Sequence, residues 1–252
     1  MAGIKKNPLS YNERDYRSRQ NSGLIASTVK IAETDLHILT SQPVSDHALL
    51  SVIKVRAEIE KYIHQHPLFL TSLVPLPFDS SAPESVQAML AAALRVGVGP
   101  MAAVAGVIAE HVGRMLLAQG IDEVIVENGG DLFVARRQSS VVAIYAGESR
   151  LSGKLGISLR PEQMPCGLCC SSGTVGHSLS FGVADAAAVL APSAALADTA
   201  ATRLGNEVVS RDSKSVNRAV ELAKTIEGIT GVVIIAGDHL GAWGDIELNP
   251  LA

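Results

Sequence analysis

Asp198 and Thr202 are the two residues whose types and spacing best suit a metal ion. They lie four positions apart in an alanine-rich stretch that predicts a helix, so both side chains fall on one helical face, about 6 Å apart between their Cβ atoms. A carboxylate and a hydroxyl supply the hard oxygen ligands that Mg²⁺ prefers, with positions left for water and phosphate oxygens. On spacing alone a simpler alternative is favoured, in which Asp198 is solvated and Thr202 bonds back to its own helix.

Two short segments of small and polar residues could hold an anion. Asn128–Asp131 contains two adjacent glycines directly after a predicted buried strand, and such glycines let the backbone approach a ligand closely. Ser171–Thr174 offers hydroxyls and backbone amides in a similar way. Taken alone, the first segment is better explained as a tight turn, and the second is equally a polar turn or a phosphate loop.

The three cysteines of the chain, Cys166, Cys169 and Cys170, lie within five positions, and His177 follows them. Four such side chains are enough in number for zinc, but the spacing is not that of a standard zinc knuckle. Reduced thiols that pack as small apolar side chains explain the cluster more simply. By itself, His177 is more typical of hydrogen bonding within a loop than of catalysis.

Hydrophobic periodicity places these residues among mingled helices and strands. Ser81 and Glu84 have the spacing of a capping box, which would open one helix. A functional loop is expected over 166–181, because that stretch is long and rich in small polar residues. The predicted helices cover residues 45–65, 81–95, 101–118, 193–204 and 215–226, and the predicted strands cover 28–39 (one strand or a hairpin), 121–126, 141–145, 186–190 and 231–236.

No internal repeat or linker divides the chain, so we expect residues 1–252 to form one α/β or α+β domain with helices packed on a β-sheet, and a polar, basic arm at 1–20. A net charge of -4 and only 4% aromatic residues disfavour nucleic-acid binding. The longest uncharged stretch with a hydrophobic composition, Val96–Ala109, is too short to span a membrane. Unpaired cysteines fit a cytoplasmic protein.

Three segments in fixed order carry a family resemblance: Val126–Asp131, Ser171–Gly173 and Ala188–Gly205. Together they resemble the FAD:protein FMN transferase (ApbE) family. That family has an Asn-x-Gly-Gly-Asp loop after a strand, a Thr-Ser-Gly loop and an Ala-Asp-Ala-x-Ala-Thr-Ala helix. The polar start of this chain is similar to the short cytoplasmic branch of that superfamily rather than to its exported lipoproteins.

The resemblance implies a role for each segment. Asp198 and Thr202 would bind Mg²⁺, and Asp131 or His177 would orient or deprotonate an acceptor hydroxyl. Two departures stand out: Met101–Gly106 lacks the lysine of the family's Gly-Gly-Ile-Ala-Lys-Gly segment, and the Asp-Pro that follows the family's histidine is missing. The residues that would line the FAD site are Asn128, Gly129, Gly130, Asp131, Ser171, Ser172 and Gly173.

The leading hypothesis is therefore Mg²⁺-assisted binding of FAD, with possible phosphoryl transfer of FMN to an acceptor such as a protein. A non-catalytic flavin- or nucleotide-binding protein is the second hypothesis. A zinc-stabilised interaction module built on Cys166, Cys169 and Cys170 is the third. The sequence leaves the acceptor and the oligomeric state open.

Overall fold

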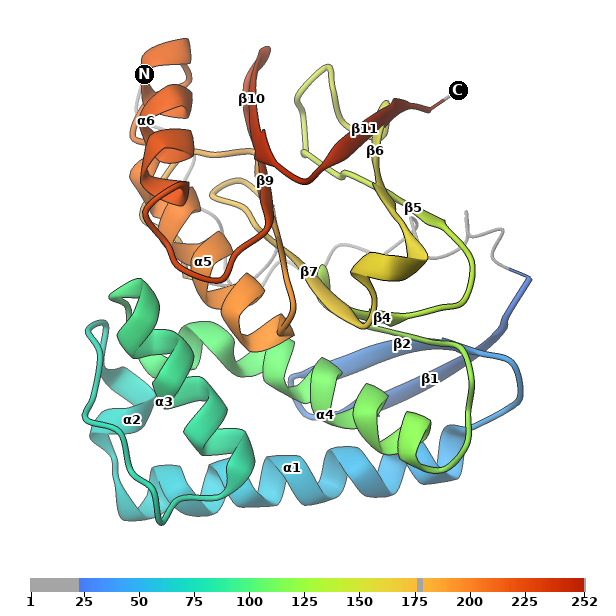
Figure 1. Ribbon diagram of the computed structural model, residues 1–252. Coiled ribbons are helices and arrows are strands. Elements are labelled where there is room, and N and C mark those ends of the chain that lie inside the picture. The colour runs from blue at the N-terminus through green and yellow to red at the C-terminus, as the bar shows by residue number, and fades with distance from the viewer. Residues whose placement is uncertain (1–22, 176–178, 252) are drawn as a thin grey trace.

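An eight-stranded antiparallel sheet organises the computed structural model, which describes residues 23–175 and 179–251 (Figure 1). The arm at 1–20 and His177 lie outside these described residues. In spatial order the strands are β1 (Ile25–Ile31), β2 (Thr34–Thr40), β3 (Val124–Asn128), β4 (Asp131–Ala135), β7 (Cys166–Ser171), β8 (Ala186–Ala191), β9 (Gly231–Ala236) and β10 (His239–Gly244).

A smaller sheet and a set of helices complete the domain. The small sheet has the order β11 (Glu247–Pro250), β6 (Leu155–Leu159) and β5 (Ser140–Ala143), again with antiparallel pairs. The helices are α1 (Ser45–Gln65), α2 (Leu68–Thr71), α3 (Glu84–Val96), α4 (Val104–Ala118), α5 (Ala194–Glu207) and α6 (Ser213–Ala223), with short 3₁₀ turns η2 (Pro100–Ala103) and η3 (Pro161–Gln163).

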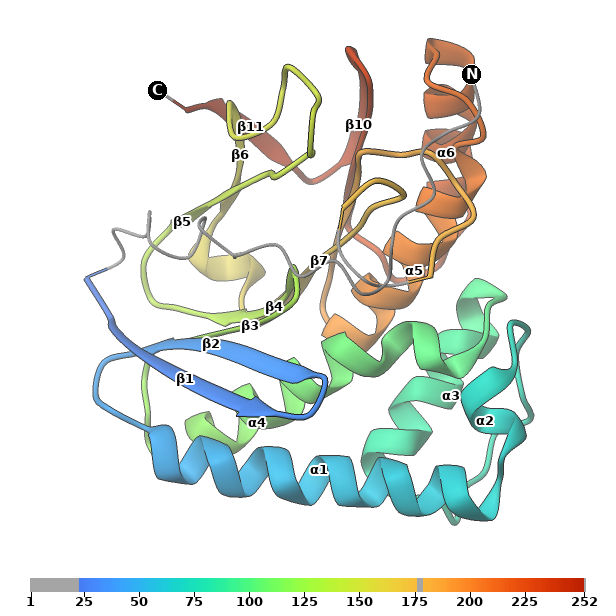
Figure 2. The ribbon, with the colours of Figure 1, turned by 180° about the vertical axis from the view of Figure 1, so that it is seen from behind.

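The large sheet is buried on both faces over much of its width. On one face, α1 and α4 pack against β1–β4 while α5 and α6 pack against β7–β10. The small sheet covers the opposite face of β4 and β7–β9 (Figures 1 and 2). Strands covered on both sides are continuously apolar, as in β8 and β9, all of whose residues are buried. The mixed fold with helices on a sheet that the sequence predicts is confirmed, in an α+β arrangement.

Most predicted elements exist within a few residues of their predicted bounds. The 45–65 helix and the 231–236 strand match α1 and β9, and the 28–39 segment is the hairpin of β1 and β2. However, α5 does not stop at Gly205 as predicted, but continues to Glu207. At Gly205 a side chain would meet only ordinary van der Waals contacts with Ser171 and Ala187, and the helix continues through this glycine without ending there.

Two local predictions were wrong. No capping box opens α3, because Pro83 occupies its N-cap without a side-chain hydrogen bond. Ser81 instead donates both its N–H and its hydroxyl to Oδ1 of Asp79, which makes a turn before the helix. The predicted 166–181 loop is a strand over its first six residues, since β7 lies between β4 and β8.

Residues Pro100–Ala118 form a continuous helical stretch that is long and apolar enough to cross a membrane by length and composition alone. In the fold, α4 packs against α1, β3 and β4, and Phe133 of β4 lies so close that a side chain at Gly113 would come within 2.1 Å of its ring. This packing in the core accounts for the apolar composition of α4.

Candidate functional site

The antiparallel register brings the sequence-predicted segments to one edge of the large sheet. Asn128 ends β3 and pairs with Asp131, which begins β4, and Asp131 in turn pairs with Cys169 of β7. Ser171 ends β7 opposite Ala187, near the start of β8. Neighbouring strands lie about 4.8 Å apart. The glycine turn and the Ser171–Gly173 segment are therefore neighbours at this edge.

Backbone conformation explains why this turn contains two glycines. Gly129 and Gly130 have φ values of 69° and 105°, a region that other residues rarely adopt. A side chain at Gly130 would meet only the Cys170 carbonyl oxygen, 3.6 Å away, so space exists above the turn. The Gly130 N–H donates to Oε1 of Glu127 at 2.9 Å, which fixes the turn from within.

Asn128 ties this turn to the beginning of α4. Its Nδ2 donates to the backbone oxygen of Ala105 at 3.2 Å. The next residue, Gly106, donates its N–H to Oδ2 of Asp198 at 2.8 Å. One turn of α4 therefore holds both the β3–β4 turn and the predicted metal ligand of α5.

Asp131 and Asp198 form a pair of buried carboxyl groups, 9% and 8% exposed. Burial and the nearby Asp198 carboxylate raise the pKa of Asp131 well above its ordinary value. Burial raises the pKa of Asp198 to about 7, although hydrogen bonds from the backbone of Gly106 and Ala105 oppose this. None of the ion pairs found among the described residues includes either aspartate.

These two carboxyl groups fit a divalent cation. Two carboxylates in a low-dielectric site repel each other when both are ionised, and a bound cation removes that cost. Thr202 lies one helical turn beyond Asp198 on the same face of α5 and is half-buried. Its hydroxyl makes no hydrogen bond to another residue in the described part of the chain, so the bonding back to the helix that spacing alone favoured is not seen. The donors are hard oxygens, as Mg²⁺ requires.

The N-terminus of α5 is capped by a residue of α4 that the sequence did not single out. Glu110 accepts the Ala194 N–H at 2.7 Å and the Ser193 hydroxyl at 3.1 Å, both on Oε2. Its other oxygen pairs with Arg114 at 2.6 Å. Since α5 has no side-chain cap of its own, Glu110 sets the position of the helix that carries Asp198.

Asp185 is the anchor of the loop that follows β7, and the sequence analysis missed it too. The carboxylate is 1% exposed and accepts hydrogen bonds from the Thr174 hydroxyl at 2.9 Å, from Arg211 at 2.8 Å and from the Gly237 N–H at 2.7 Å. Within the loop, Ser172 Oγ accepts the Val175 N–H at 2.9 Å. A three-way anchor of this kind joins residues too far apart in sequence to form a motif.

Asn206 holds the far end of the same loop. Its Oδ1 accepts the Phe181 N–H at 2.8 Å, and a side chain at Gly182 would come within 1.9 Å of the Gly205 carbonyl oxygen. Asn206 lies four positions beyond Thr202, so the face of α5 that begins with Asp198 runs directly to this loop. The spacing of four positions from Thr202 was the signal in the sequence that could have pointed to Asn206.

The cysteines do not converge on one point. Cys169 lies on the face of β7 that packs against α5, whereas Cys166 and Cys170 lie on the opposite face of β7. Burial raises the pKa of the Cys166 and Cys170 thiols to about 12. The described residues contain no group of three metal-binding side chains of the His, Cys, Asp and Glu types. The geometry therefore gives no support to a zinc site on these three thiols.

Comparisons with known proteins find relatives that match most of this chain. A family model described as AbpE bacteria matches residues 17–229. A UPF0280 protein of Methanococcus maripaludis is 41% identical over 221 residues, which cover 86% of this chain and 90% of that protein. A UPF0280 protein of Methanosarcina acetivorans is 40% identical over 218 residues, covering 86% and 85%.

Solved structures share the fold at low sequence identity. The flavin transferase ApbE of Vibrio cholerae superposes with a TM-score of 0.58 and 13% identity, covering 87% of this chain and 96% of that one. The apo form of Pseudomonas stutzeri flavinyl transferase ApbE gives a TM-score of 0.52 and 14% identity, covering 88% and 94%. At such identities the likeness concerns the fold.

Proposed function

This chain belongs to the family described as AbpE bacteria, and from that premise we propose that it binds FAD with the help of Mg²⁺ at the edge of the large sheet. We also propose transfer of FMN to an acceptor, a protein hydroxyl, as its activity. The flavin transferases that share the fold support flavin as the ligand class. A cytoplasmic location is part of the proposal, supported by three free cysteines.

The buried pair of Asp131 and Asp198 is the observation that carries this proposal. Its charge is matched by no cationic side chain in the ion pairs of the described residues, and Thr202 offers a free hydroxyl one turn away. Beside it, Gly130 leaves the backbone open to a ligand. Asp198 and Thr202 would hold Mg²⁺, and the glycine turn with Ser171–Gly173 would contact the dinucleotide.

When bound, Mg²⁺ supplies neutralisation of phosphate charge. In the reaction, the acceptor oxygen forms a bond to the FMN phosphorus, the phosphoanhydride bond to AMP breaks, and the acceptor hydroxyl loses its proton. Asp131 is suited to accept that proton, because burial and the Asp198 carboxylate raise its pKa well above its ordinary value and so make it a stronger base. His177 remains the second candidate for this role.

Binding of a flavin or nucleotide without transfer is the alternative function. The absence of the family's Asp-Pro after His177 favours it, since that segment belongs to the acceptor side. The two functions differ in one product. Incubation with FAD, Mg²⁺ and candidate acceptors releases AMP only if FMN is transferred.

The test of the proposal is FAD titration with and without Mg²⁺ for the parent, Asp198→Asn and Thr202→Val. We expect Asp198→Asn to fold and to lose the Mg²⁺-dependent part of the FAD affinity, and Thr202→Val to lose less of it, because a neutral hydroxyl binds the cation more weakly. Asp122→Asn, at an exposed surface pair with Arg137, is the matched control and should bind like the parent. If the parent binds FAD equally well with and without Mg²⁺, the metal assignment is refuted. If the parent does not bind FAD at all, FAD is refuted as the ligand.

A further inference from the structure

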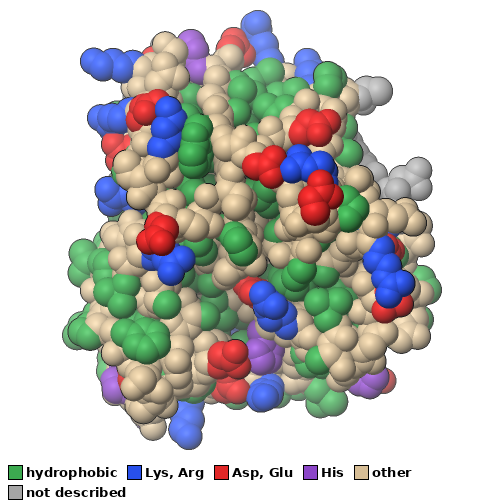
Figure 3. Space-filling model, in the orientation of Figure 1, with side chains coloured by type: hydrophobic (Ala, Val, Ile, Leu, Met, Phe, Trp, Pro, Cys, Tyr) green, Lys and Arg blue, Asp and Glu red, His purple; other side chains and the backbone are tan. Residues whose placement is uncertain are grey.

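The segment around α2 exposes an unusual amount of apolar surface. Residues 67–78 contain no charged side chain. We call this segment the α2 patch. Five of its large apolar side chains are between 50% and 71% exposed: Leu68, Leu70, Leu73, Val74 and Phe78. Figure 3 shows hydrophobic side chains gathered at the lower left of the molecule, over α2 and α3.

The α2 patch borders a groove and not a flat surface. A hollow of about 590 Å³ is lined by Leu68, Phe69, Leu76 and Phe78 from this segment and by Leu90 of α3, among others. A smaller hollow of about 360 Å³ continues along α1 toward Glu58 and Lys61. Exposed leucines beside an apolar groove provide both the protruding and the receiving part of a packed interface.

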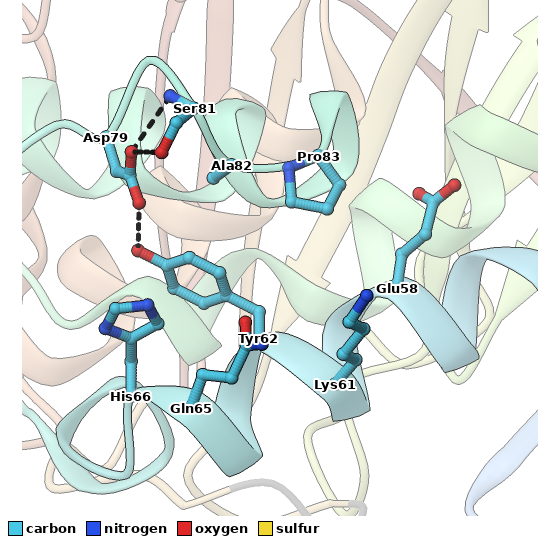
Figure 4. Close-up of a pocket in the computed structure, with 9 residues that line it drawn as sticks. All are labelled: Glu58, Lys61, Tyr62, Gln65, His66, Asp79, Ser81, Ala82 and Pro83. Atoms are coloured by element: carbon cyan, nitrogen blue, oxygen red, sulfur yellow. Dashed lines mark hydrogen bonds between the residues drawn. The ribbon is translucent and has the colours of Figure 1, made fainter.

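The backbone behind the patch is fixed. Tyr62 of α1 donates its hydroxyl to Oδ2 of Asp79 at 3.0 Å, directly after Phe78, and its ring stacks on His66 with centroids 4.3 Å apart (Figure 4). The Ser72 carbonyl packs against Gly99 so closely that a side chain there would come within 1.8 Å. Three prolines, at 67, 75 and 77, restrict the segment further. Docking on this surface therefore costs little ordering entropy.

We propose that the α2 patch is the contact surface between two copies of this chain, related by a twofold axis. The five side chains leave on the order of 500 Å² of apolar surface open, near the upper range for the largest patch of a monomer. A standard interface buries about 800 Å² on each partner, and about 65% of a homodimer interface is apolar. The apolar area expected on each partner is therefore about 500 Å², which is close to the apolar area exposed by the α2 patch.

Charge favours a second copy as the occupant. A twofold interface places the same surface on both partners, so a charge near the axis would face its own copy, and a charge away from the axis would need an opposite charge in the same surface. The α2 patch carries none over twelve residues, and self-pairing meets no repulsion. A membrane surface is the less suitable partner, because peripheral membrane segments combine apolar residues with Lys and Arg.

The experiment measures the molar mass by sedimentation from about 1 to about 100 µM for the full chain, Leu73→Glu, and Leu68→Glu. We expect the parent to be a dimer in the upper part of this range and both variants to be monomers with an unchanged circular dichroism spectrum, because a glutamate would be buried unpaired in the interface. Leu50→Glu is the matched control: Leu50 of α1 is 66% exposed but lies outside the patch, and this variant should dimerise like the parent.

Three outcomes would overturn the proposal. One is a parent that stays monomeric throughout the range. The second is a dimer that survives Leu73→Glu and Leu68→Glu, and its loss in Leu50→Glu would then place the interface on α1. The third is a monomeric parent that sediments with neutral phosphatidylcholine vesicles and loses this binding in Leu73→Glu, which would assign the patch to a membrane. Each readout is independent of FAD binding.

Discussion

The backbone N–H of Gly106 donates a 2.8 Å hydrogen bond to Oδ2 of Asp198, although 92 positions separate the two residues. The contact is possible because Gly106 has no side chain. A Cβ at this position would lie 2.3 Å from the Ala194 carbonyl oxygen and 2.9 Å from the Asp198 Cβ. Close approach of α4 to α5 thus positions the carboxyl group that we assign to the metal.

Gly106→Ala should therefore lower the free energy of unfolding by about 2 kcal/mol, the typical cost of overpacking a core contact, and weaken Mg²⁺-dependent FAD binding. Gly205→Ala is the matched control, because its added methyl meets nothing nearer than 3.5 Å. Alanine in a helix is favoured over glycine by about 0.5–1 kcal/mol, so this control should be neutral or stabilising. Denaturant unfolding measures both, and equal effects of the two substitutions would contradict the packing argument.

Glu110→Ala should destabilise the protein by about 1–2 kcal/mol, since it leaves the first amide of α5 without a partner. Glu110→Gln keeps an oxygen that can accept this bond, so we expect it to recover part of the loss. Arg114→Ala leaves the cap in place and removes the half-exposed ion-pair partner of Glu110 together with its cation–π contact with the Phe133 ring, so it should cost less than Glu110→Ala. Thermal unfolding of the three variants tests the order, and an Arg114→Ala effect larger than that of Glu110→Ala would show that the ion pair matters more.

The stability of the metal-free protein should fall as the pH rises from about 4 to about 7. The pKa of Asp198 is raised from 3.8 to about 7 in the fold, so the folded state retains a proton that the unfolded state has lost. Its contribution to stability is full below the unfolded pKa and is lost as the pH passes the folded pKa. Mg²⁺ binds the ionised form and should raise the melting temperature much more at about pH 8 than at about pH 5.

Melting curves with and without Mg²⁺ across this range check the prediction, and Asp198→Asn serves as the control because it cannot ionise. A Mg²⁺ effect of the same size at every pH, or one that persists in Asp198→Asn, would go against a carboxylate as the metal ligand.

The cysteines should be unreactive in the native protein. Burial raises the pKa of Cys169 well above its ordinary value and that of Cys166 and Cys170 to about 12, so little thiolate exists near pH 8. A thiol reagent should label all three only after denaturation, and metal analysis of the purified protein should find no stoichiometric zinc. Zinc whose removal unfolds the protein would revive the zinc-module hypothesis.

Asp185→Asn should loosen the loop after β7. The amide replaces a carboxylate that receives three hydrogen bonds, one of them from Arg211, so amide hydrogen exchange at Thr174 and Val175 should increase. FAD affinity should fall at the same time if this loop contacts the ligand. Asp238→Asn, at an exposed position nearby, should change neither. Unchanged exchange in Asp185→Asn would show that the loop is held by its backbone contacts alone.

The sequence predicted those parts of the site that depend on local spacing. Asp198 and Thr202 share a helical face because the helix period is 3.6 residues, and the Asn128–Asp131 turn follows its strand as the pattern indicates. Whether these residues bind their expected ligands stays a prediction. The roles of Glu110 and Asp185 were not predictable, because their partners come from other elements and no periodicity encodes such contacts.

The strand β7 is an element whose conformation the local sequence does not predict. Its sequence, Cys-Gly-Leu-Cys-Cys-Ser, has small residues typical of a loop, yet it lies at the centre of the sheet. A side chain at Gly167 would come within 2.3 Å of the Ala194 Cα, so the glycine at this position leaves room for α5. Tertiary packing determined the conformation here, against the local propensity.

The Asp185 anchor also bears on when the site can form during synthesis. Its partners lie at positions 174, 211 and 237, and the contact with Gly237 closes only after β9 has paired with β8. Contacts of such sequence separation form late in folding, because each requires a long loop to close first. A nascent chain that has emerged through α5 would carry both Asp131 and Asp198, but Asp185 would still lack its Arg211 and Gly237 contacts. Ligand binding is therefore expected to follow near-complete emergence of the domain from the ribosome.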